Sequence, residues 1–187
     1  MTVALNPIPF WFIRHGETDW NAEGRSQGRT DIPLNTVGLA QARRAALAMV
    51  DRDIATIVAS PLSRALRTAE IVAEALNLPV GTDAELQEVC FGTEEGKPMG
   101  DWYDDWVAGS FTPDGAETFA GLGARAVAAI NRATAKPGPV LVVAHGALFR
   151  ALRGALGHKP NVRTPNALST WCAPPTTGDV WEISPVG

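Results

Sequence analysis

Cysteine and histidine are both scarce in this sequence. Its 187 residues include two cysteines, Cys90 and Cys172, and three histidines, His15, His145 and His158. Two cysteines cannot form a disulfide framework or a four-cysteine metal site, and they are typical of reduced thiols in the cytosol. Any chemistry that needs an imidazole must therefore come from one of three positions.

Long apolar runs and an excess of positive charge are also absent. No apolar stretch approaches the roughly 20 residues of a membrane span. The segment before Glu17 has no basic n-region and is interrupted by Pro7 and Pro9, so it does not resemble a signal peptide. The 16 basic and 20 acidic residues give a net charge of −4, which argues against a nucleic-acid or membrane partner. We therefore predict a cytoplasmic protein, and the sequence leaves its oligomeric state, including a homodimer, open.

The acidic residues are unevenly distributed. Residues 94–117 contain seven acids against one base, Lys97, a local net charge of 1 − 7 = −6. The surrounding stretch, residues 92–123, is rich in Gly, Pro, Asp and Trp and has little periodicity. We interpret it as a short lid insertion within a single domain that covers residues 1–187. An anion-binding site would have to take its basic residues from outside this stretch.

Short apolar runs alternate with stretches rich in helix-forming residues. Buried strands are predicted at residues 10–13, 53–59 and 139–144, and helices at residues 39–50, 61–76 and 147–156. Residues 179–183 alternate in polarity and indicate a last strand at a sheet edge. This order predicts an α/β fold with three layers, α/β/α, and a mostly parallel central sheet.

Three of the predicted strands end in reactive residues. The first leads to Arg14 and His15, the second to Arg64, and the third to His145 and Gly146. The carboxyl ends of parallel strands meet at one edge of the sheet, where ligands bind in folds of this type. We therefore expect these five residues to lie close together.

These side chains favour an anion as the ligand. Ser60 is expected to cap a helix with Arg64 in its first turn, where a cation is unfavourable unless an anion is nearby. Gly146 would expose the N–H groups of the next helix, and the arginines would form bidentate forks with phosphate. The chain has no G-x-x-x-x-G-K-[ST] loop, which excludes a P-loop nucleotide site.

Other interpretations of these residues stay open at this point. His15 and His145 could each be a core or capping histidine, and Arg64 could be a surface arginine paired with an acid. Two histidines could also bind a metal ion, but a metal needs further ligands and these histidines are flanked by arginine. We predict no metal and no cofactor.

Four sequence motifs resemble those of one protein family. Residues 12–21 (FIRHGETDWN) resemble the RHG signature of the histidine phosphatase superfamily, the phosphoglycerate mutase-like proteins. Residues 24–40 resemble the loop that follows this signature, residues 60–65 (SPLSRA) the second motif, and residues 144–146 (AHG) the third. The resemblance runs in the family's order from about residue 9 to 156 and implies the phosphoglycerate mutase-like α/β fold.

The resemblance also implies a role for each matching residue. His15 would be the nucleophile that takes the phosphoryl group as a covalent phosphohistidine, while its other ring nitrogen donates to the carbonyl of Gly16. The remaining positions would bind phosphate or substrate and stabilise the transition state: Arg14, Arg64, His145 and Gly146 at the phosphoryl oxygens, Asn21 in support, and Gln27 and Gly28 at the substrate.

The general acid is implied by residues 86–92 (LQEVCFG), which resemble the family segment that supplies it and place Glu88 at the acid's position. Beside a phosphate dianion this carboxyl would stay protonated, donate to the leaving alcohol and then deprotonate the attacking water. Glu85 is the nearest rival. The sequence departs from the family where Cys90 replaces an acid and Glu94 a tryptophan, which concerns the packing beneath the acid.

Phosphomonoester hydrolysis fits this sequence better than its alternatives. Mutases of the family recognise a second anionic group with basic residues of the insertion, whereas this insertion carries Lys97 alone among seven acids and should repel polyanionic substrates. A non-catalytic phosphate- or protein-binding module would be expected to lack His15, Glu88 or His145, and all three are present. We predict a phosphatase that acts on a small phosphorylated metabolite, such as a sugar phosphate or a nucleoside-type monophosphate.

Overall fold

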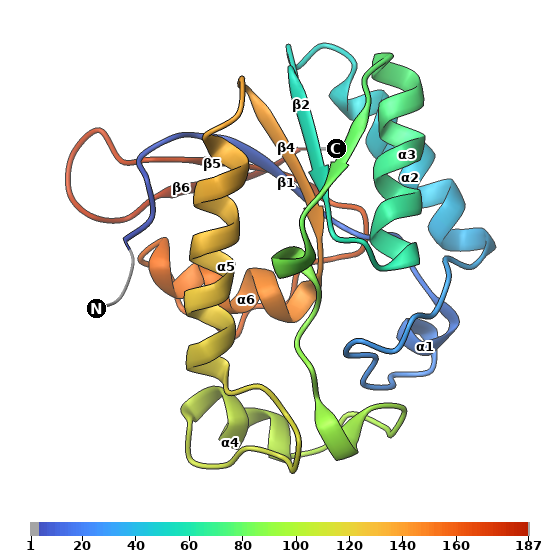
Figure 1. The fold of residues 1–187 in the computed structure, drawn as a ribbon, viewed down its shortest axis with the longest axis vertical. Coiled ribbons are helices and arrows are strands. Elements are labelled where there is room, and N and C mark those ends of the chain that lie inside the picture. Colours follow the sequence, from blue (N-terminus) through green and yellow to red (C-terminus); the bar gives the residue numbers. More distant parts are fainter. Residues whose placement is uncertain (1–3, 187) are drawn as a thin grey trace.

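The structure, a computed structural model, describes residues 4–186 and contains one six-stranded sheet (Figure 1). The strands are β1 (Phe10–Arg14), β2 (Thr56–Ala59), β3 (Val80–Thr82), β4 (Val140–Ala144), β5 (Ser169–Ala173) and β6 (Glu182–Val186). The helices are α1 (Asp19–Ala22), α2 (Thr36–Met49), α3 (Ser63–Leu76), α4 (Trp102–Ala108), α5 (Phe119–Thr134) and α6 (Gly146–Ala155), with short 3₁₀ turns η1 (Ala84–Leu86) and η2 (Gly92–Glu94). Within residues 4–186, no helix combines the length and the apolar character that a membrane span requires.

The sheet has the order β3-β2-β4-β1-β5-β6 and is mostly parallel. β4 pairs in parallel with β1 on one side and with β2 on the other, and β2 pairs in parallel with β3. β5 runs antiparallel to both β1 and β6. β1 and β4 are buried along their whole length, which is why their sequences are nearly continuous apolar runs. The predicted α/β fold with a mostly parallel sheet is confirmed.

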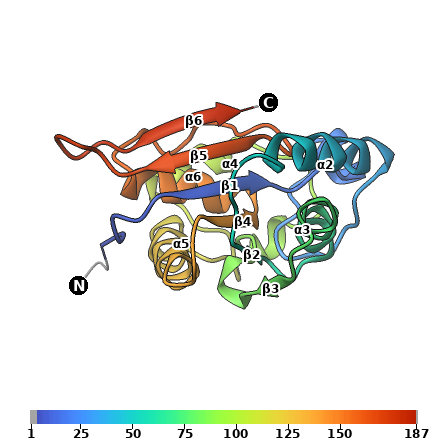
Figure 2. The same ribbon diagram turned by 90° about the horizontal axis from the view of Figure 1, so that it is seen from above.

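Helices cover both faces of this sheet, as Figure 2 shows from above. The side chains of β1 alternate between the two faces. Phe10 and Phe12 pack in the core that contains α5 and α6, whereas Trp11 and Ile13 pack in the core that contains α2 and α3. The chain therefore forms the three predicted layers.

Some predicted boundaries differ from those in the structure. The second strand begins at Thr56 rather than at residue 53, since Asp53 has a left-handed backbone with φ 51°. The last strand lies at a sheet edge, as predicted, but covers residues 182–186, because the N–H of Trp181 donates to a carbonyl at the end of α6. The sequence pattern does not reveal β3, β5 or α5. In β5 (STWCA), buried Ser and Thr side chains replace the apolar run that would have marked a strand.

Helix α3 begins at Ser63, later than predicted, and Ser60 does not cap it. The carboxylate of Asp31 accepts hydrogen bonds from the Ser63 N–H at 2.8 Å and from its hydroxyl at 2.7 Å. The Ser60 hydroxyl lies instead 2.7 Å from Nε2 of His145. The cap therefore comes from a residue 32 positions earlier in the chain, and Ser60 bonds to a residue of the candidate site.

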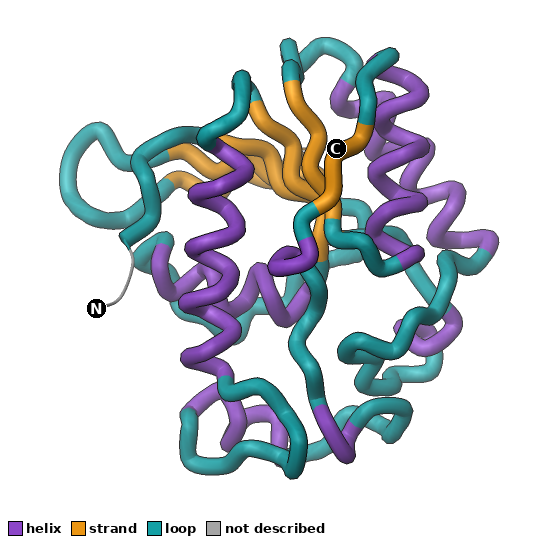
Figure 3. The backbone as a smooth tube through the Cα atoms, viewed as in Figure 1, coloured by secondary structure: helices purple, strands orange, loops and turns teal. Residues whose placement is uncertain are grey.

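β2, β4 and β1 lie side by side, so their carboxyl ends meet at one edge of the sheet. The register pairs Arg14 with Ala144 and Ala59 with Val143, which places the residues after these strands next to one another. Loops and short helices, among them α1 and α4, gather beyond this edge in the lower half of Figures 1 and 3. The topology thus brings the three predicted strand ends together.

The acidic segment 92–123 also contributes to the core. Tyr103 and Trp106 of α4 are buried in the same cluster as Phe12. Phe91, just before this segment, packs edge-on against Trp106, with ring centroids 5.3 Å apart. The aromatic residues of α4 therefore fix this segment to the rest of the molecule, and Tyr103 also reaches the cleft described below.

Candidate active site

The imidazole of His15 is buried at the carboxyl end of β1 and has a defined tautomer. Its Nδ1 lies 2.7 Å from the carbonyl oxygen of Gly16, the contact that the sequence predicts. A carbonyl only accepts, so Nδ1 carries the hydrogen and the lone pair of the neutral ring is on Nε2. Burial, and then the charges of Arg64 and Arg14, hold the pKa of His15 well below its usual value of 6.5. At neutral pH His15 is therefore an uncharged base.

His145 is fully buried beside His15, with ring centroids 5.2 Å apart. Its Nε2 is 2.7 Å from the hydroxyl of Ser60, which accepts a hydrogen bond from the N–H of Leu62. When Ser60 donates its own hydrogen to Nε2, Nδ1 of His145 carries the ring hydrogen and is a donor. This Nδ1 has no partner among the described residues. Burial first, and then the charge of Arg64, hold the pKa of His145 well below 6.5.

Arg14 and Arg64 are buried and are held by carbonyl groups, with no acid paired to either in the described part of the chain. Nη1 of Arg14 donates to the carbonyl of Thr164 at 2.6 Å. Arg64 donates to the carbonyls of Thr30 at 2.9 Å and Gly28 at 2.7 Å. In both arginines Nε is buried and lacks a partner among residues 4–186. Arg64 is thus not the surface ion pair that the sequence left open.

These guanidinium groups leave the site with positive charge that no protein group balances closely. Burial lowers the pKa of Arg14 to about 10 and also lowers that of Arg64, and the charge of Glu88 opposes both shifts. A buried cation is unfavourable unless an anion pairs with it. Nε of Arg14, Nε of Arg64 and Nδ1 of His145 are all buried and have no partner within the described residues. Such a set fits the oxygens of a phosphoryl group.

Arg14, His15 and Arg64 line a cleft, and Asn21, Gln27 and Gly28 line it as well. Oδ1 of Asn21 accepts from the amide of Asn166 at 3.1 Å. Oε1 of Gln27 accepts from the hydroxyl of Thr18 at 2.9 Å. The NH2 groups of both amides are therefore the ends left for a ligand. Gly28 has a φ of +55°, and a Cβ there would lie 2.1 Å from a carboxylate oxygen of the neighbouring segment, so this position requires glycine.

The carboxylate of Glu88 lies at the N-terminus of helix α6. Its Oε2 accepts from the N–H of Ala147 at 2.9 Å. Its Oε1 accepts from the N–H of Leu148 at 2.9 Å and from that of Val89 at 3.1 Å. Because each carboxylate oxygen has two lone pairs, Oε1 is saturated and Oε2 keeps one lone pair for a proton.

This arrangement corrects the expected use of helix α6. The sequence predicts that the helix N-terminus binds the ligand anion, but Glu88 occupies the N–H groups of the second and third helical residues. Among the described residues, the N–H of Gly146, at the first helical position, is left without a protein acceptor. A Cβ at Gly146 would lie 3.1 Å from Nε of Arg14, so glycine leaves room for that guanidinium.

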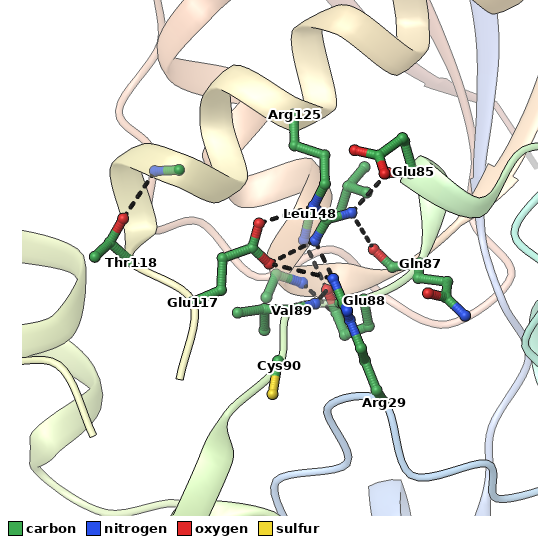
Figure 4. Close-up of polar contacts among 12 residues, drawn as sticks. Arg29, Glu85, Gln87, Glu88, Val89, Cys90, Glu117, Thr118, Arg125 and Leu148 are labelled. Atoms are coloured by element: carbon green, nitrogen blue, oxygen red, sulfur yellow. Dashed lines mark hydrogen bonds and ion pairs between the residues drawn. The ribbon is translucent and has the colours of Figure 1, made fainter. Parts of the chain in front are cut away.

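Arg125 of α5 holds the irregular backbone that carries Glu88 (Figure 4). Its Nη1 donates to the carbonyls of Glu85 at 2.6 Å and Gln87 at 2.7 Å. Its Nη2 approaches the carbonyl of Glu88 at 3.4 Å. The same guanidinium forms two hydrogen bonds with the carboxylate of Glu117, at 2.8 and 2.7 Å. Glu85, the rival acid, contributes a carbonyl to this network and does not line the cleft, whereas Glu88 does.

Similarity to known proteins agrees with this geometry. Residues 10–170, most of the chain, match the model of the histidine phosphatase superfamily (branch 1). The chain belongs to the histidine phosphatase superfamily. It is 41% identical over 146 residues to "Uncharacterized phosphatase PhoE" of Bacillus subtilis (strain 168), which covers 75% of this chain and 72% of that protein. It is 35% identical over 167 residues to "Probable phosphoglycerate mutase GpmB" of Yersinia pestis (strain Pestoides F), which covers 81% of this chain and 77% of that protein.

Solved structures of other proteins share the fold. "Mycobacterial hydrolase 1" superposes with a TM-score of 0.84 at 28% identity, over 95% of this chain and 96% of the other. A mycobacterial glucosyl-3-phosphoglycerate phosphatase superposes with a TM-score of 0.80 at 28% identity, over 94% of this chain and 96% of the other. The predicted family is confirmed, and the phosphatases among these relatives support a phosphoric monoester hydrolase.

This histidine phosphatase departs from the family pattern at Cys90 and Glu94, and neither residue lines the cleft. Sγ of Cys90 contacts the carbonyl of Gly115 at 3.4 Å. Glu94 pairs with Lys97 at 3.1 Å. Both departures therefore lie outside the residues that face a substrate.

The acidic insertion places none of its acids among the residues that line the cleft, and the predicted repulsion of polyanionic substrates stays a prediction. The insertion contributes Met99 and Tyr103 to the cleft. Among all the residues that line the cleft, Glu88 is the one acid, and it lies outside the insertion. Acids of the insertion form hydrogen bonds with other parts of the chain. Glu95, for example, accepts from the hydroxyl and the N–H of Thr30. The lining of the cleft therefore contains four arginines and a single acid, Glu88.

Some residues of the cleft are not evident from the sequence. Met99 and Arg150 line it without belonging to any of the recognised motifs, and Arg25 and Phe91 line it from within two motifs in which they were assigned no role. The sequence does indicate that Arg150 could reach the site, because it is four residues after Gly146 and so lies on the same face of α6. Within residues 4–186, no group of three His, Cys, Asp or Glu side chains is placed to hold a metal ion.

Proposed function

We propose that this chain hydrolyses a small phosphomonoester through a covalent phosphohistidine on His15. The observation that carries the proposal is the neutral imidazole of His15 near three buried donors that have no partner in the described part of the chain. Donors held in a low-dielectric site are already oriented when negative charge develops on an incoming phosphoryl group. They would hold the phosphoryl oxygens while Nε2 of His15 faces the phosphorus.

In the first step, the lone pair of His15 Nε2 forms a bond to phosphorus, and the bond between phosphorus and the ester oxygen breaks. That oxygen leaves with the electron pair and takes the proton from Oε2 of Glu88. Nδ1 keeps its hydrogen, and its bond to the Gly16 carbonyl stabilises the positive charge on the phosphorylated ring. The products of this step are phosphohistidine, a free alcohol and the Glu88 carboxylate.

In the second step, water replaces the histidine. Oε2 of Glu88 takes a proton from the water as its oxygen attacks phosphorus. The bond between phosphorus and Nε2 breaks, its electron pair returns to His15, and inorganic phosphate leaves. Between the steps, the N–H groups of Ala147, Leu148 and Val89 stabilise the ionised Glu88.

Mutase chemistry is the second candidate, and the relative named a probable phosphoglycerate mutase favours it. Two observations support hydrolysis instead. The relative with 41% identity is named a phosphatase. Lys97, the one base in residues 94–117, pairs with Glu94 and is not among the residues that line the cleft. The insertion therefore offers the cleft no basic group of its own.

The cytoplasm is the location that we propose for this activity. Cys90 and Cys172 are both free thiols, which supports a reducing compartment. The proposed reaction uses water and the substrate, with no cofactor.

Release of inorganic phosphate from a panel of phosphomonoesters tests this proposal. The panel would include para-nitrophenyl phosphate and 3-phosphoglycerate, with a chelator present and with His15→Ala in parallel. We expect turnover that survives the chelator and is lost in the variant. If the folded protein releases no phosphate from any ester but exchanges the phosphoryl position of 3-phosphoglycerate in a ³¹P NMR assay, the mutase replaces the hydrolase.

A further inference from the structure

The segment 164–167, which comes after helix α6, lies against the end of strand β1. The carbonyl of Thr164 accepts from Nη1 of Arg14 at 2.6 Å, and the N–H of Ala167 donates to the carbonyl of Arg14 at 2.8 Å. Ala167 has a left-handed backbone with φ 53°, which is unfavourable for a residue with a Cβ. A strained turn is therefore held against the residue that precedes the proposed nucleophile.

The side chain of Asn166, in this turn, reaches the main chain of His15. Its Nδ2 donates to the carbonyl of His15 at 3.0 Å, and the N–H of Ala167 approaches the same oxygen at 3.3 Å. The ladder between β1 and β5 ends one position earlier on this side, at the pair of Ile13 and Ser169 and the turn that follows it. Asn166 and Ala167 therefore hold the carbonyl of His15 where a paired strand no longer does.

The second Nδ2 hydrogen of Asn166 is donated to Oδ1 of Asn21, at 3.1 Å. The same oxygen accepts from the N–H of Thr18 at 3.3 Å, so both of its lone pairs are occupied. The backbone groups fix the direction of this network, because a carbonyl only accepts and an N–H only donates. Asn166 must therefore present its NH2 group, which leaves the NH2 group of Asn21 for the cleft.

Asn166 reaches the site from behind. It is not among the residues that line the cleft, whereas His15 and Asn21 both are. It is half-buried and lines a separate cavity beside helix α2. One amide thus bonds to two residues of the candidate site while it stays outside that site itself.

We propose that Asn166 is a positioning residue, which holds the nucleophile and one phosphate-binding side chain at a fixed spacing. This inference rests on the proposed function. Attack on phosphorus needs Nε2 of His15 close to it and aligned with it, and a misplacement of about 1 Å can lower a rate about 10²-fold. Loss of the Asn166 amide should slow the chemistry more than it weakens binding, because Arg14 and Arg64 keep their own carbonyl partners.

Two substitutions of Asn166 separate positioning from the filling of space. Asn166→Ala should lower kcat for an alkyl phosphate about 10- to 100-fold, with KM changed less than about threefold. Asn166→Asp keeps the shape but turns carboxylate oxygens toward two acceptors, so it should lower kcat further than Asn166→Ala does. A residue that only filled space would give the opposite order. Single-turnover formation of phosphohistidine, followed by rapid quench, shows whether the first step is slowed.

Asn161→Ala is the matched control. Asn161 belongs to the same connection between α6 and β5, and its amide also donates a hydrogen bond, to the carboxylate of Asp104 at 2.9 Å. Because this bond lies outside the site, kcat should stay unchanged. Urea titrations identify any variant that is unfolded under the assay conditions. Asn166→Ser, which keeps one donor and should fall between Asn166→Ala and the unsubstituted chain, provides a further measurement in that event.

A double-mutant cycle with Asn21→Ala locates the effect. Asn166→Ala should lower kcat less in the Asn21→Ala background than in the unsubstituted chain, because part of its effect passes through Asn21. Strict additivity contradicts the assignment, and so does an unchanged kcat in both Asn166 variants or a milder effect of Asn166→Asp than of Asn166→Ala. These failures leave phosphate release by the unsubstituted chain intact. No release from any ester by that chain, while folded, would count against the proposed phosphatase itself, and the positioning role would fall with it.

Discussion

The two walls of the cleft are built in different ways. One wall contains Arg14 and His15, with His145 buried beside His15, at the ends of neighbouring strands whose register fixes their spacing. The other contains Glu88, on a segment without a helix or strand, and residues of the acidic insertion. The position of Glu88 depends on hydrogen bonds from Arg125 and from helix α6.

On the first wall the backbone fixes the positions of the functional groups, whereas on the second wall side chains fix them. Along the strand-end wall, sheet hydrogen bonds hold the chain whether or not one side chain is removed. On the acid wall, the single side chain of Arg125 serves several carbonyls and a carboxylate, so its loss should displace the acid. We expect substitutions on the first wall to remove chemistry and those on the second wall to disturb position as well.

The largest effect is expected from His15→Ala on the strand-end wall. Loss of the nucleophile should lower phosphate release on the order of 10⁴-fold or more, because the remaining groups cannot form the covalent intermediate. Acid-quenched reactions with ³²P-labelled ester measure the phosphoenzyme directly. Labelled protein in the variant would show that another residue is the nucleophile.

The second largest effect is expected from Glu88→Gln on the acid wall, which should lower phosphate release from alkyl esters by about 10²- to 10⁴-fold. Para-nitrophenyl phosphate should lose less in its first step, since nitrophenolate leaves without a proton. Single-turnover kinetics on both esters measure the difference. Because Glu88 also activates water, phosphohistidine should accumulate in the variant. Equal losses for the two esters, without accumulation, would mean that Glu88 is not the acid.

Arg125→Met should lower both stability and rate. It leaves Glu117 with the more exposed Arg29, at 3.9 Å, in place of its buried partner, which costs at most about 3–5 kcal/mol of the free energy of unfolding. We expect kcat for alkyl esters to fall about tenfold because Glu88 moves. The double variant Arg125→Met/Glu117→Gln should recover part of the stability in urea titrations, but not the rate. Recovery of both would reduce Arg125 to a stabilising residue.

Low pH should lower the free energy of unfolding through the two buried histidines at the strand ends. The pKa values of His15 and His145 are held well below 6.5 in the folded protein, whereas the unfolded chain binds protons near 6.5. Below pH 6.5 the unfolded state therefore binds more protons, and the free energy of unfolding falls by about 1.4 kcal/mol per pH unit for each histidine. Above that pH this contribution is constant. Urea titrations at pH 7, 6 and 5 should show a shallower decline in His15→Ala than in the unsubstituted chain.

The smallest effect is expected from Arg132→Met, which is the matched control for Arg125. Both arginines belong to α5, but Arg132 pairs with Asp83 at 3.0 Å while its side chain is 49% exposed. An exposed pair contributes less than about 1 kcal/mol, and Arg132 does not contact the Glu88 segment. Thermal unfolding and phosphate release should both stay close to those of the unsubstituted chain. A tenfold loss of rate would mean that the effect of Arg125 is a general property of α5.

The strand-end wall could be predicted from sequence because its signals are local. Short apolar runs mark β1 and β4, and Arg14, His15 and His145 follow from where those runs end. The acid wall has no such pattern. Glu88 could be assigned by family resemblance, but its contacts with α6 and Arg125 join residues 37 or more positions apart, and no periodicity reports them.

Two further features have the same origin. Ser60 fits the sequence rule for a helix cap, yet Asp31 supplies the cap, and Ser60 bonds to His145 across two strands. The acids near Lys97 give the insertion its negative charge but do not line the cleft, because net charge along a segment does not tell which way its side chains point. Both features depend on tertiary contacts that a linear pattern does not contain.

Helix α6 connects the two walls. Its first residue, Gly146, lies beside Arg14, its next two N–H groups bind Glu88, and Arg150 lines the cleft. Gly146 and Arg150 are separated by about 6 Å along the helix axis, at 1.5 Å per residue. Because the buried face of α6 packs in the core as one rigid piece, these distances cannot change independently. One turn of this helix therefore fixes the spacing between Arg14, Glu88 and Arg150 around the cleft.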